Sequence, residues 1–165
     1  MVEQHFLTNP EKLKALVGAA AIKPNDRVLE LGSGGGTVAA ILPPCFLTLV
    51  ELDQGLADGL RVRFPKAAVI AGDALRTLEI AAADIVLSNL PHTLTPEVLE
   101  RLTRKTFRRA LVAVHVEDEI DALGAAFDEL KLEPLFTLAE HDFTPAQPFC
   151  SQVLQVTRQY PTHAP

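Results

Sequence analysis

The feature that most constrains the fold of this chain is a strand-like run that leads into a cluster of glycines. Residues 28–31 are two leucines, a valine and a glutamate, and Gly32, Gly34 and Gly36 follow before a helical pattern starts near residue 37. Glycine has no Cβ atom, so at these positions the backbone can turn and come close to a ligand. A strand, a glycine turn and a helix in this order are typical of the opening unit of an α/β fold.

Strand and helix patterns alternate along the rest of the chain without a linker, a repeat or a low-complexity tract. Asn9 and Pro10 are a cap and a first-turn proline, so a first helix is expected from there to about Ala20. Alternation predicts a mainly parallel seven-stranded sheet covered by helices on both faces, with ligands at the carboxyl ends of its strands. Pro145 and Pro148 lie where a hairpin would reverse direction, so the last strand is expected to be antiparallel. We expect strands near residues 27–31, 46–51, 67–71, 84–88, 110–115, 134–140 and 150–157, and further helices near residues 37–42, 54–63, 95–106 and 118–130.

The composition fits one domain of this kind. With 165 residues, of which 48% are hydrophobic, residues 1–165 suffice for a single core and leave no room for a second domain. Cys45 and Cys150 show neither metal nor redox spacing, which favours a reducing compartment. No run approaches about eighteen apolar residues, and Glu3 and Gln4 stand where a signal peptide has basic residues. We therefore expect a cytoplasmic protein that uses no metal.

Acidic residues lie at the ends of three consecutive predicted strands. The glycine spacing differs from the dinucleotide fingerprint, and together with Glu30 it fits a loop that holds an amino acid and a ribose without a pyrophosphate. Glu51 ends the second strand about 20 residues after the loop, where ribose hydroxyls lie, and Asp73 follows the third strand, where it can accept a bond from an adenine amino group. Each could also be a solvated carboxylate at a strand end. Together they predict binding of S-adenosylmethionine (AdoMet).

A short polar segment, Asn89-Leu90-Pro91-His92, follows the strand predicted at residues 84–88. This segment suits the binding of an amino group on an aromatic system. It has an amide at the carboxyl end of a strand, a proline that fixes the turn, and a flat ring. By itself the tetrapeptide is also a common strand-to-helix turn. Downstream of an AdoMet loop, it predicts a site for an amine acceptor.

The order of these motifs resembles that of ribosomal RNA adenine-N6 dimethyltransferases of the KsgA/Erm group. The resemblance covers nearly the whole chain and implies a Rossmann-like class I AdoMet-dependent methyltransferase. The matching segments are Gln4-His5-Phe6-Leu7, the loop from Glu30 to Gly36, Glu51-Leu52-Asp53, Gly72-Asp73-Ala74, Asn89-Leu90-Pro91-His92, and Phe143-Thr144-Pro145 with Ser151.

The resemblance implies a role for each of these segments. Asn89 and Leu90 would each accept one N–H bond from the adenine amine, and direct in-line methyl transfer would follow without a deprotonated base. His92 and Phe143 would hold the base between their rings. The implied catalytic residues are Asn89, Leu90, Pro91 and His92, and the implied cofactor-binding residues are Gln4, His5, Leu7, Glu30, Gly32, Gly34, Gly36, Glu51, Leu52, Asp73, Ala74 and Asn89.

Three departures from the family pattern concern the acceptor. His92 stands where the family has tyrosine, and Gln147-Pro148 stands where it has proline and lysine. The family's C-terminal helical domain, which holds RNA, is expected to be absent because the chain ends at Pro165. The net charge of −6 and the sequence pI near 5.3 also oppose free-standing RNA binding.

One basic group stands out against this acidic character. Arg101, Arg104, Lys105 and Arg108 recur at helical spacing, so we expect them to share one helical face after the catalytic segment. They are candidates for contact with RNA phosphates. The equal alternative is a solvated helix face.

Three hypotheses follow for the function. The first is methylation or dimethylation of adenine N6 in RNA, with rRNA or a ribosomal subunit as the partner. The second is N-methylation of a small-molecule, peptide or lipid amine, which suits an acidic protein. The third is an inactive AdoMet-binding factor in ribosome assembly or transcription, against which the intact Asn89-Leu90-Pro91 segment argues.

Overall fold

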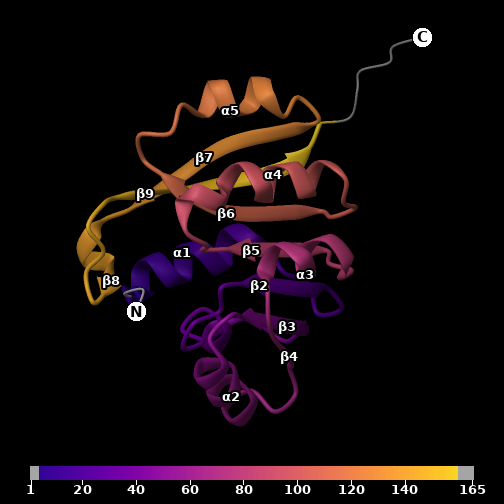
Figure 1. The fold of residues 1–165 in the computed structure, drawn as a ribbon, viewed down its shortest axis with the longest axis vertical. Coiled ribbons are helices and arrows are strands. Elements are labelled where there is room, and N and C mark those ends of the chain that lie inside the picture. Colours follow the sequence, from indigo (N-terminus) through magenta and orange to yellow (C-terminus); the bar gives the residue numbers. More distant parts are fainter. Residues whose placement is uncertain (1–3, 160–165) are drawn as a thin grey trace.

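Seven strands form one mixed sheet in the computed structural model, which describes residues 4–159 (Figure 1). The strand order is β4-β3-β2-β5-β6-β9-β7, and β9 runs antiparallel to both of its neighbours. The predicted sheet with its antiparallel last strand is therefore confirmed. The strands are β2 (Arg27–Leu31), β3 (Phe46–Glu51), β4 (Ala68–Ala71), β5 (Ile85–Ser88), β6 (Arg109–His115), β7 (Leu130–Leu138) and β9 (Ser151–Arg158).

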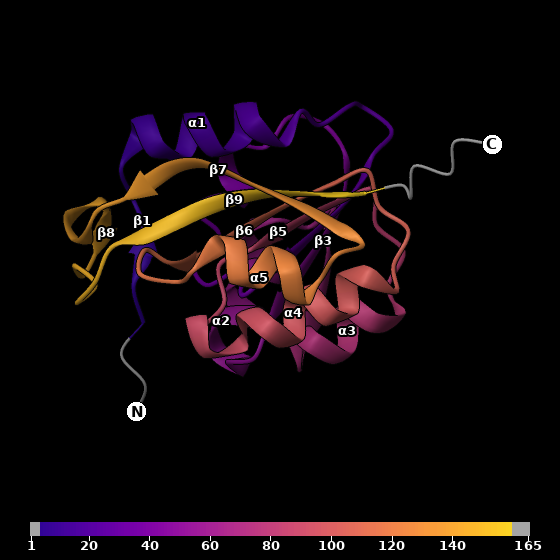
Figure 2. The same ribbon diagram turned by 90° about the horizontal axis from the view of Figure 1, so that it is seen from above.

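Helices cover both faces of this sheet, as the alternation predicts. Successive side chains of a strand point to opposite faces. Accordingly, Val28 lies in one core cluster with Leu13 of α1, and Leu29 lies in another with Leu99 of α4. Figure 2 shows α1 on one side of the sheet and α3, α4 and α5 on the other. No helix within residues 4–159 is long and apolar enough to cross a membrane. The helices are α1 (Pro10–Ala20), α2 (Gln54–Arg63), α3 (Ala74–Ile80), α4 (Thr95–Thr103) and α5 (Ile120–Ala126).

One expected helix is missing, one helix was not expected, and α4 and α5 end three and four residues earlier than expected. The helix predicted near residues 37–42 is wrong, because the chain makes only a single 3-10 turn at Ala39–Ile41. Pro43 and Pro44 follow this turn, and a residue before proline disfavours the helical conformation. Conversely, α3 has no counterpart among the expected helices, since its 7 residues are too few for a helical period to stand out.

A second, two-stranded ladder lies at the left end of the molecule in Figure 1. It joins β1 (Phe6–Leu7) to β8 (Phe143–Thr144) in antiparallel pairing. Its pairing is reinforced by a hydrogen bond between the hydroxyls of Thr8 and Thr144 at 2.8 Å. The start of the described chain is thereby tied to the segment that precedes β9.

The glycine turn after β2 has a conformation that side chains resist. Gly34 and Gly36 have φ angles of +54° and +78°. A Cβ atom on Gly36 would lie 2.5 Å from the ring of Phe64, which packs over the turn from the end of α2. Both the backbone angle and the close approach therefore require glycine at residue 36.

We predict that Gly36→Ala lowers the free energy of unfolding by roughly 1 to 3 kcal/mol, because it adds strain and a steric clash. Chemical denaturation measures the effect. Gly35→Ala is the matched control, since a Cβ atom there meets nothing within 4 Å. Equal stability of the two variants would contradict the packing described here.

Candidate functional site

The carboxyl ends of the parallel strands β2, β3, β4 and β5 gather at one edge of the sheet, on the left in Figure 1. The predicted site segments follow these strand ends. In open α/β sheets this edge holds the ligand. No three His, Cys, Asp or Glu side chains among residues 4–159 are grouped so that they could hold a metal ion.

Glu51, at the end of β3, holds the glycine turn by a hydrogen bond. The residue is 6% exposed, and its two carboxylate oxygens accept hydrogen bonds from the backbone N–H of Gly34 at 2.8 Å and of Asp53 at 2.9 Å. A carboxylate oxygen has further lone pairs, so ribose hydroxyls can still donate to it. Glu51 thus has a structural task beside the ribose contact predicted for it.

Glu30 lies beside Glu51 and is buried, with 6% of the residue exposed. Its Oε2 atom is buried and has no hydrogen-bond partner within the described structure. Burial, followed by the neighbouring charge of Glu51, raises the pKa of the Glu30 carboxyl to about 8. A buried, unmatched carboxyl group under a glycine turn suits a ligand that brings positive charge, as the sulfonium and ammonium groups of AdoMet do.

The two aspartates after β3 and β4 cap helices. An oxygen of Asp53 accepts from the amide of Leu56 at 2.9 Å, and an oxygen of Asp73 accepts from the amide of Arg76 at 2.8 Å. Leu52, predicted to contact the cofactor, is 78% exposed at this edge. The second oxygen of Asp73 stays available for the adenine contact that the sequence predicts.

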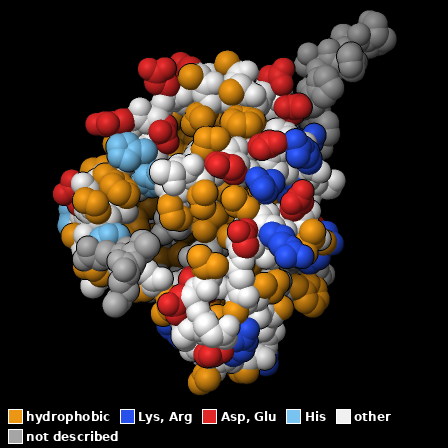
Figure 3. All heavy atoms as spheres, in the orientation of Figure 1, with side chains coloured by type: hydrophobic (Ala, Val, Ile, Leu, Met, Phe, Trp, Pro, Cys, Tyr) orange, Lys and Arg blue, Asp and Glu red, His pale blue; other side chains and the backbone are white. Residues whose placement is uncertain are grey.

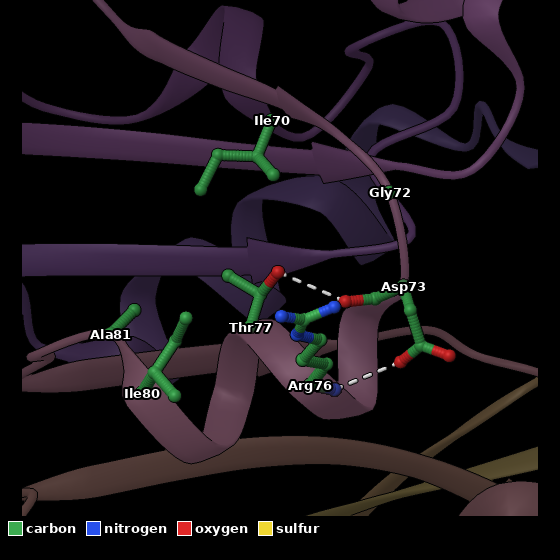
Figure 4. Close-up of a pocket in the computed structure, with 7 residues that line it drawn as sticks. All are labelled: Ile70, Gly72, Asp73, Arg76, Thr77, Ile80 and Ala81. Carbon is green, nitrogen blue, oxygen red and sulfur yellow. Dashed lines mark hydrogen bonds between the residues drawn. The ribbon is translucent and has the colours of Figure 1, made fainter.

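A shallow groove adjoins Asp73 between β4 and α3 (Figure 4). Figure 4 shows the side chains of Ile70, Thr77 and Ile80 around it, while the carboxylate of Asp73 is turned away toward Arg76. Thr77 donates a hydrogen bond to the backbone oxygen of Asp73 at 2.9 Å. The groove therefore presents an aliphatic wall next to the strand end at which the adenine is expected.

The N-terminal strand covers the glycine turn. Gly34 packs against the ring of Phe6, since a Cβ atom there would lie only 2.7 Å from it. His5 forms a hydrogen bond through Nδ1 to the backbone oxygen of Pro145 at 3.0 Å, and Gln4 is exposed. Leu7 is 4% exposed and belongs to the core, so its side chain does not line the site as predicted. Phe6 takes that place.

The acceptor segment lies directly against the glycine turn. A Cβ atom on Gly32 would lie 3.4 Å from the backbone oxygen of Asn89 and 3.0 Å from the side chain of Leu90. The side chain of Asn89 is exposed, whereas Ser88 before it is buried. The segments predicted for the cofactor and for the acceptor are thus in contact across β2 and β5.

The predicted pairing of His92 with Phe143 is wrong. Phe143 lies in β8, is 3% exposed and belongs to the core. The ring next to His92 is that of Phe149, with centroids 4.6 Å apart, and His115 lies 5.5 Å away. Phe143 was inferred from its place in a motif, and no periodicity in the sequence indicates that the chain turns Phe149 toward His92.

The predicted basic face is also wrong. Helix α4 ends at Thr103, so residues 104–108 continue as a loop. Arg104 pairs with Glu100, and Arg108 pairs with Asp26 ahead of β2. The Nζ atom of Lys105 donates to the backbone oxygens of Leu78 and Ala81 at the end of α3, and Arg101 donates to the backbone oxygen of Glu97.

These basic residues extend toward the amino ends of the strands, opposite the candidate site. The backbone N–H of Arg108 donates to the oxygen of Asp84, the residue before β5. In Figure 3 many of the visible Lys and Arg side chains lie on the right, mixed with acidic ones, and the histidines lie on the left, while apolar side chains are spread over the face. Phosphate contact by the basic group remains a prediction, without the shared helical face on which it was based.

The arrangement of strands and helices is similar to that of known methyltransferase structures. The structure superposes on 23S rRNA methyltransferase ErmE with a TM-score of 0.81 and 20% identity, covering 93% of this chain and 70% of that one. A dimethyladenosine transferase from Plasmodium falciparum gives a TM-score of 0.82 and 22% identity, covering 94% of this chain and 64% of that one. The fold is that of a class I methyltransferase.

The sequence gives the family. The family described as ribosomal RNA adenine dimethylase matches residues 2–121, and the chain belongs to it. Ribosomal RNA small subunit methyltransferase A of Parasynechococcus marenigrum is 38% identical over 115 residues, covering 64% of this chain and 38% of the relative. The protein of the same description from Synechococcus sp. (strain CC9605) is 32% identical over 170 residues, covering 90% and 62%. The chain thus spans about two fifths to three fifths of the length of these relatives.

We predict that Glu30→Gln stabilises the cofactor-free protein at pH 8 by roughly 1 to 3 kcal/mol, because the amide stays uncharged at every pH, whereas the buried carboxyl group must take up a proton or bury a charge. The pKa of Glu30 rises from an ordinary 4.5 to about 8 on folding, so the folded state retains a proton that the unfolded state releases. Stability from this group is full below about pH 4.5 and is lost as the pH rises toward 8.

Denaturation at pH 5 and pH 8 measures this difference. The gain should be clearly smaller at pH 5. Glu79→Gln, an exposed carboxyl group on α3, is the control and should keep the pH dependence of the wild type. A Glu30→Gln variant with that same pH dependence would show that the Glu30 carboxyl is not buried in its protonated form.

Proposed function

We propose that this chain binds AdoMet at the carboxyl edge of its sheet and methylates the N6 amino group of an adenine in ribosomal RNA. Family membership supports the reaction class. The observation that carries the proposal is the close approach of Gly32, in the glycine turn, to the backbone oxygen of Asn89 and the side chain of Leu90 in the acceptor segment. Donor and acceptor would meet within one site, in a single methyltransferase domain that acts in the cytoplasm.

The cofactor would lie across the ends of β2, β3 and β4. Glu51 would accept from the ribose hydroxyls, and Asp73 would accept from the adenine amine. Glu30 would lie under the charged methionine end, and Phe6, with Gln4 and His5 beside it, would cover that end. When bound, AdoMet supplies an electrophilic methyl group on its sulfonium.

The acceptor amine would be held by Asn89 and Leu90. Its lone pair is delocalised into the adenine ring, so the nitrogen is a weak nucleophile. Two N–H bonds, to the side-chain oxygen of Asn89 and the backbone oxygen of Leu90, would favour a pyramidal nitrogen whose lone pair points at the methyl group. Such positioning contributes roughly 7 to 11 kcal/mol when the reacting atoms are held in contact. His92 would stack on the base, which is worth about 1 to 3 kcal/mol.

The charge at the site favours a second candidate, N-methylation of a small-molecule or peptide amine, which would bind as a cation and react as the free base. Glu117, Glu119 and Asp121 follow β6 at the carboxyl edge, and all three are exposed. Asp53 and Asp73 are exposed at the same edge. An acidic rim repels RNA phosphates and attracts amines.

Methyl-transfer assays with labelled AdoMet decide between the two candidates. The acceptors are total RNA, ribosomal subunits and small amines, each tested across a salt series. Label in RNA, located at N6 of adenine, supports the proposal. Label only in amines selects the second candidate, and no label in any acceptor contradicts both.

We predict that Asn89→Ala lowers turnover about a hundredfold or more, since it removes a contact made to the reacting nitrogen. AdoMet affinity, measured by calorimetry, should change little. Gln159→Ala removes an exposed amide far from the site and should keep full activity. Unchanged turnover in Asn89→Ala would remove the residue from the mechanism, and a matching loss of affinity would make it structural.

Glu51→Ala should weaken AdoMet binding by roughly 1 to 3 kcal/mol or more, because the ribose loses its acceptor. The variant should also lose stability without cofactor, since the amides of Gly34 and Asp53 lose their partner. Calorimetry and thermal denaturation measure the two effects. Leu52→Ala, which changes an exposed neighbour, is the control for stability. Unaltered affinity in Glu51→Ala would exclude the ribose contact.

A further inference from the structure

A buried chain of polar side chains leads to His92. The side-chain amide of Gln147 donates a hydrogen bond to the hydroxyl oxygen of Ser151 at 3.0 Å, and this oxygen lies 3.2 Å from Nε2 of His92. Ser151 is 0% exposed and Gln147 is 6% exposed. Buried polar groups are costly unless they are hydrogen-bonded, so the three side chains form one ordered unit.

The backbone that carries this chain is held firmly. Ser151 is the first residue of β9, where it pairs with His115 of β6 on one side and with Leu138 of β7 on the other. The backbone N–H of Gln147 donates to the backbone oxygen of Glu140 at 3.2 Å. His92 itself starts a single 3-10 turn, His92–Leu94. The sheet thus supplies a fixed hydroxyl group to a side chain that lies in a turn.

The hydrogen bonds of the chain have one direction. An amide N–H can only donate, so the Ser151 oxygen accepts from Gln147. Of the two partners of this hydroxyl within residues 4–159, only Nε2 of His92 can accept its hydrogen. Nε2 therefore carries a lone pair, and the hydrogen of the neutral ring is on Nδ1.

The bond to Ser151 is the one polar contact that orients the ring. Nδ1 of His92 is buried and has no partner within the described structure. The rings of Phe149 and His115 lie with their centroids 4.6 Å and 5.5 Å away. Ring contacts of this kind depend mainly on shape, so they select weakly between an imidazole and its flipped form. The choice of orientation therefore falls to the hydroxyl of Ser151.

We propose that Ser151 and Gln147 are positioning residues that hold the His92 ring in one orientation, with its hydrogen on Nδ1, so that the acceptor base meets a fixed ring face. This inference rests on the stacking role proposed above for His92. A ring that is already oriented loses less freedom when the base binds. A phenyl ring is unchanged by a flip, so the need for such a partner is particular to histidine.

The 15N resonances of the His92 ring test the proposed orientation in the cofactor-free protein. They report which ring nitrogen carries hydrogen, and the measurement is made above about pH 8, where an ordinary histidine is uncharged. The signals are assigned by their absence in His92→Phe. The wild type should carry hydrogen on Nδ1 and none on Nε2.

Gln147→Glu should reverse this pattern. A carboxylate accepts the hydroxyl hydrogen, so Ser151 would then accept from Nε2 of His92. Gln159→Glu adds the same charge at an exposed position and should keep the wild-type pattern. Hydrogen on Nε2 in the wild type, or an unchanged pattern in Gln147→Glu, overturns the inference.

Methyl transfer tests whether the orientation matters for the reaction. Ser151→Ala should lower kcat/KM for the acceptor about tenfold to a hundredfold, the loss expected when a group beside the reacting atoms is misplaced. AdoMet affinity should stay as in the wild type, and Ser151→Thr, which keeps the hydroxyl, should restore most of the rate.

A double-mutant cycle separates positioning from a purely structural role. In a His92→Phe background the ring has no nitrogen to hold, so Ser151→Ala should cause no further loss. The same loss with either ring at residue 92 overturns the positioning role. If Ser151→Ala does not fold, Gln147→Glu takes its place, and a kcat/KM equal to that of Gln159→Glu overturns the role as well.

The inference and the proposed function fail in different experiments. The ring nitrogens are measured without substrate, so the expected pattern in the wild type and in Gln147→Glu supports the orientation even if no acceptor is methylated. In that case only the proposed function is contradicted. Methylated RNA together with hydrogen on Nε2 in the wild type overturns this inference and leaves the proposed function in place.

Discussion

The hydrogen bond from the Gly34 amide to the buried carboxylate of Glu51 is the interaction on which the site depends. It holds the glycine turn to the end of β3. Burying a carboxylate is costly unless it is matched, and the second bond, from the amide of Asp53, meets that condition. The neighbouring Glu30 has no such match, so the structure keeps one unsatisfied carboxyl group where a cationic ligand is expected.

The β1–β8 ladder joins the two halves of the site. Phe6 packs on Gly34 of the cofactor turn, and the next residue pairs with Phe143, at the start of the segment that carries Phe149 to His92. Asn9 donates to the carboxylate of Asp142 at 2.6 Å, which fixes the same segment to the start of α1. Phe6, proposed to cover the cofactor, and the segment that carries Phe149 are therefore parts of one hydrogen-bonded unit, although they lie near opposite ends of the sequence.

Charge is divided between the two edges of the sheet. At the amino ends, cations are used to hold the fold, since Arg108 binds Asp26 and Arg27 binds Asp84. At the carboxyl ends, the exposed acidic side chains include Asp53, Asp73 and Glu117. The family to which the chain belongs points to RNA, while this distribution offers its phosphates little attraction. In the proposed reaction the acceptor would therefore be recognised by stacking and amide contacts more than by charge.

The sequence by itself determined the sheet, the order of its motifs and the strand ends at which they lie. Buried parallel strands appear as continuous apolar runs, and the turns after them show as Gly32 to Gly36, Asp73 and Asn89, so both signals are local. The local signal failed near residues 37–42, where Pro43 and Pro44 stop a helix, and at α3, which is too short to show a period.

Tertiary structure alone decided which side chains of distant segments meet. It buried Phe143 and Leu7 in the core, brought Phe149 and His115 to His92, and drew Lys105 and Arg108 into bonds at the amino edge. These outcomes depend on how far each loop carries the chain before it packs, and on the competition between core burial and exposure at the site. The order of the motifs contains no information on either effect, because it gives which residues follow one another along the chain and not which of them are in contact in the fold.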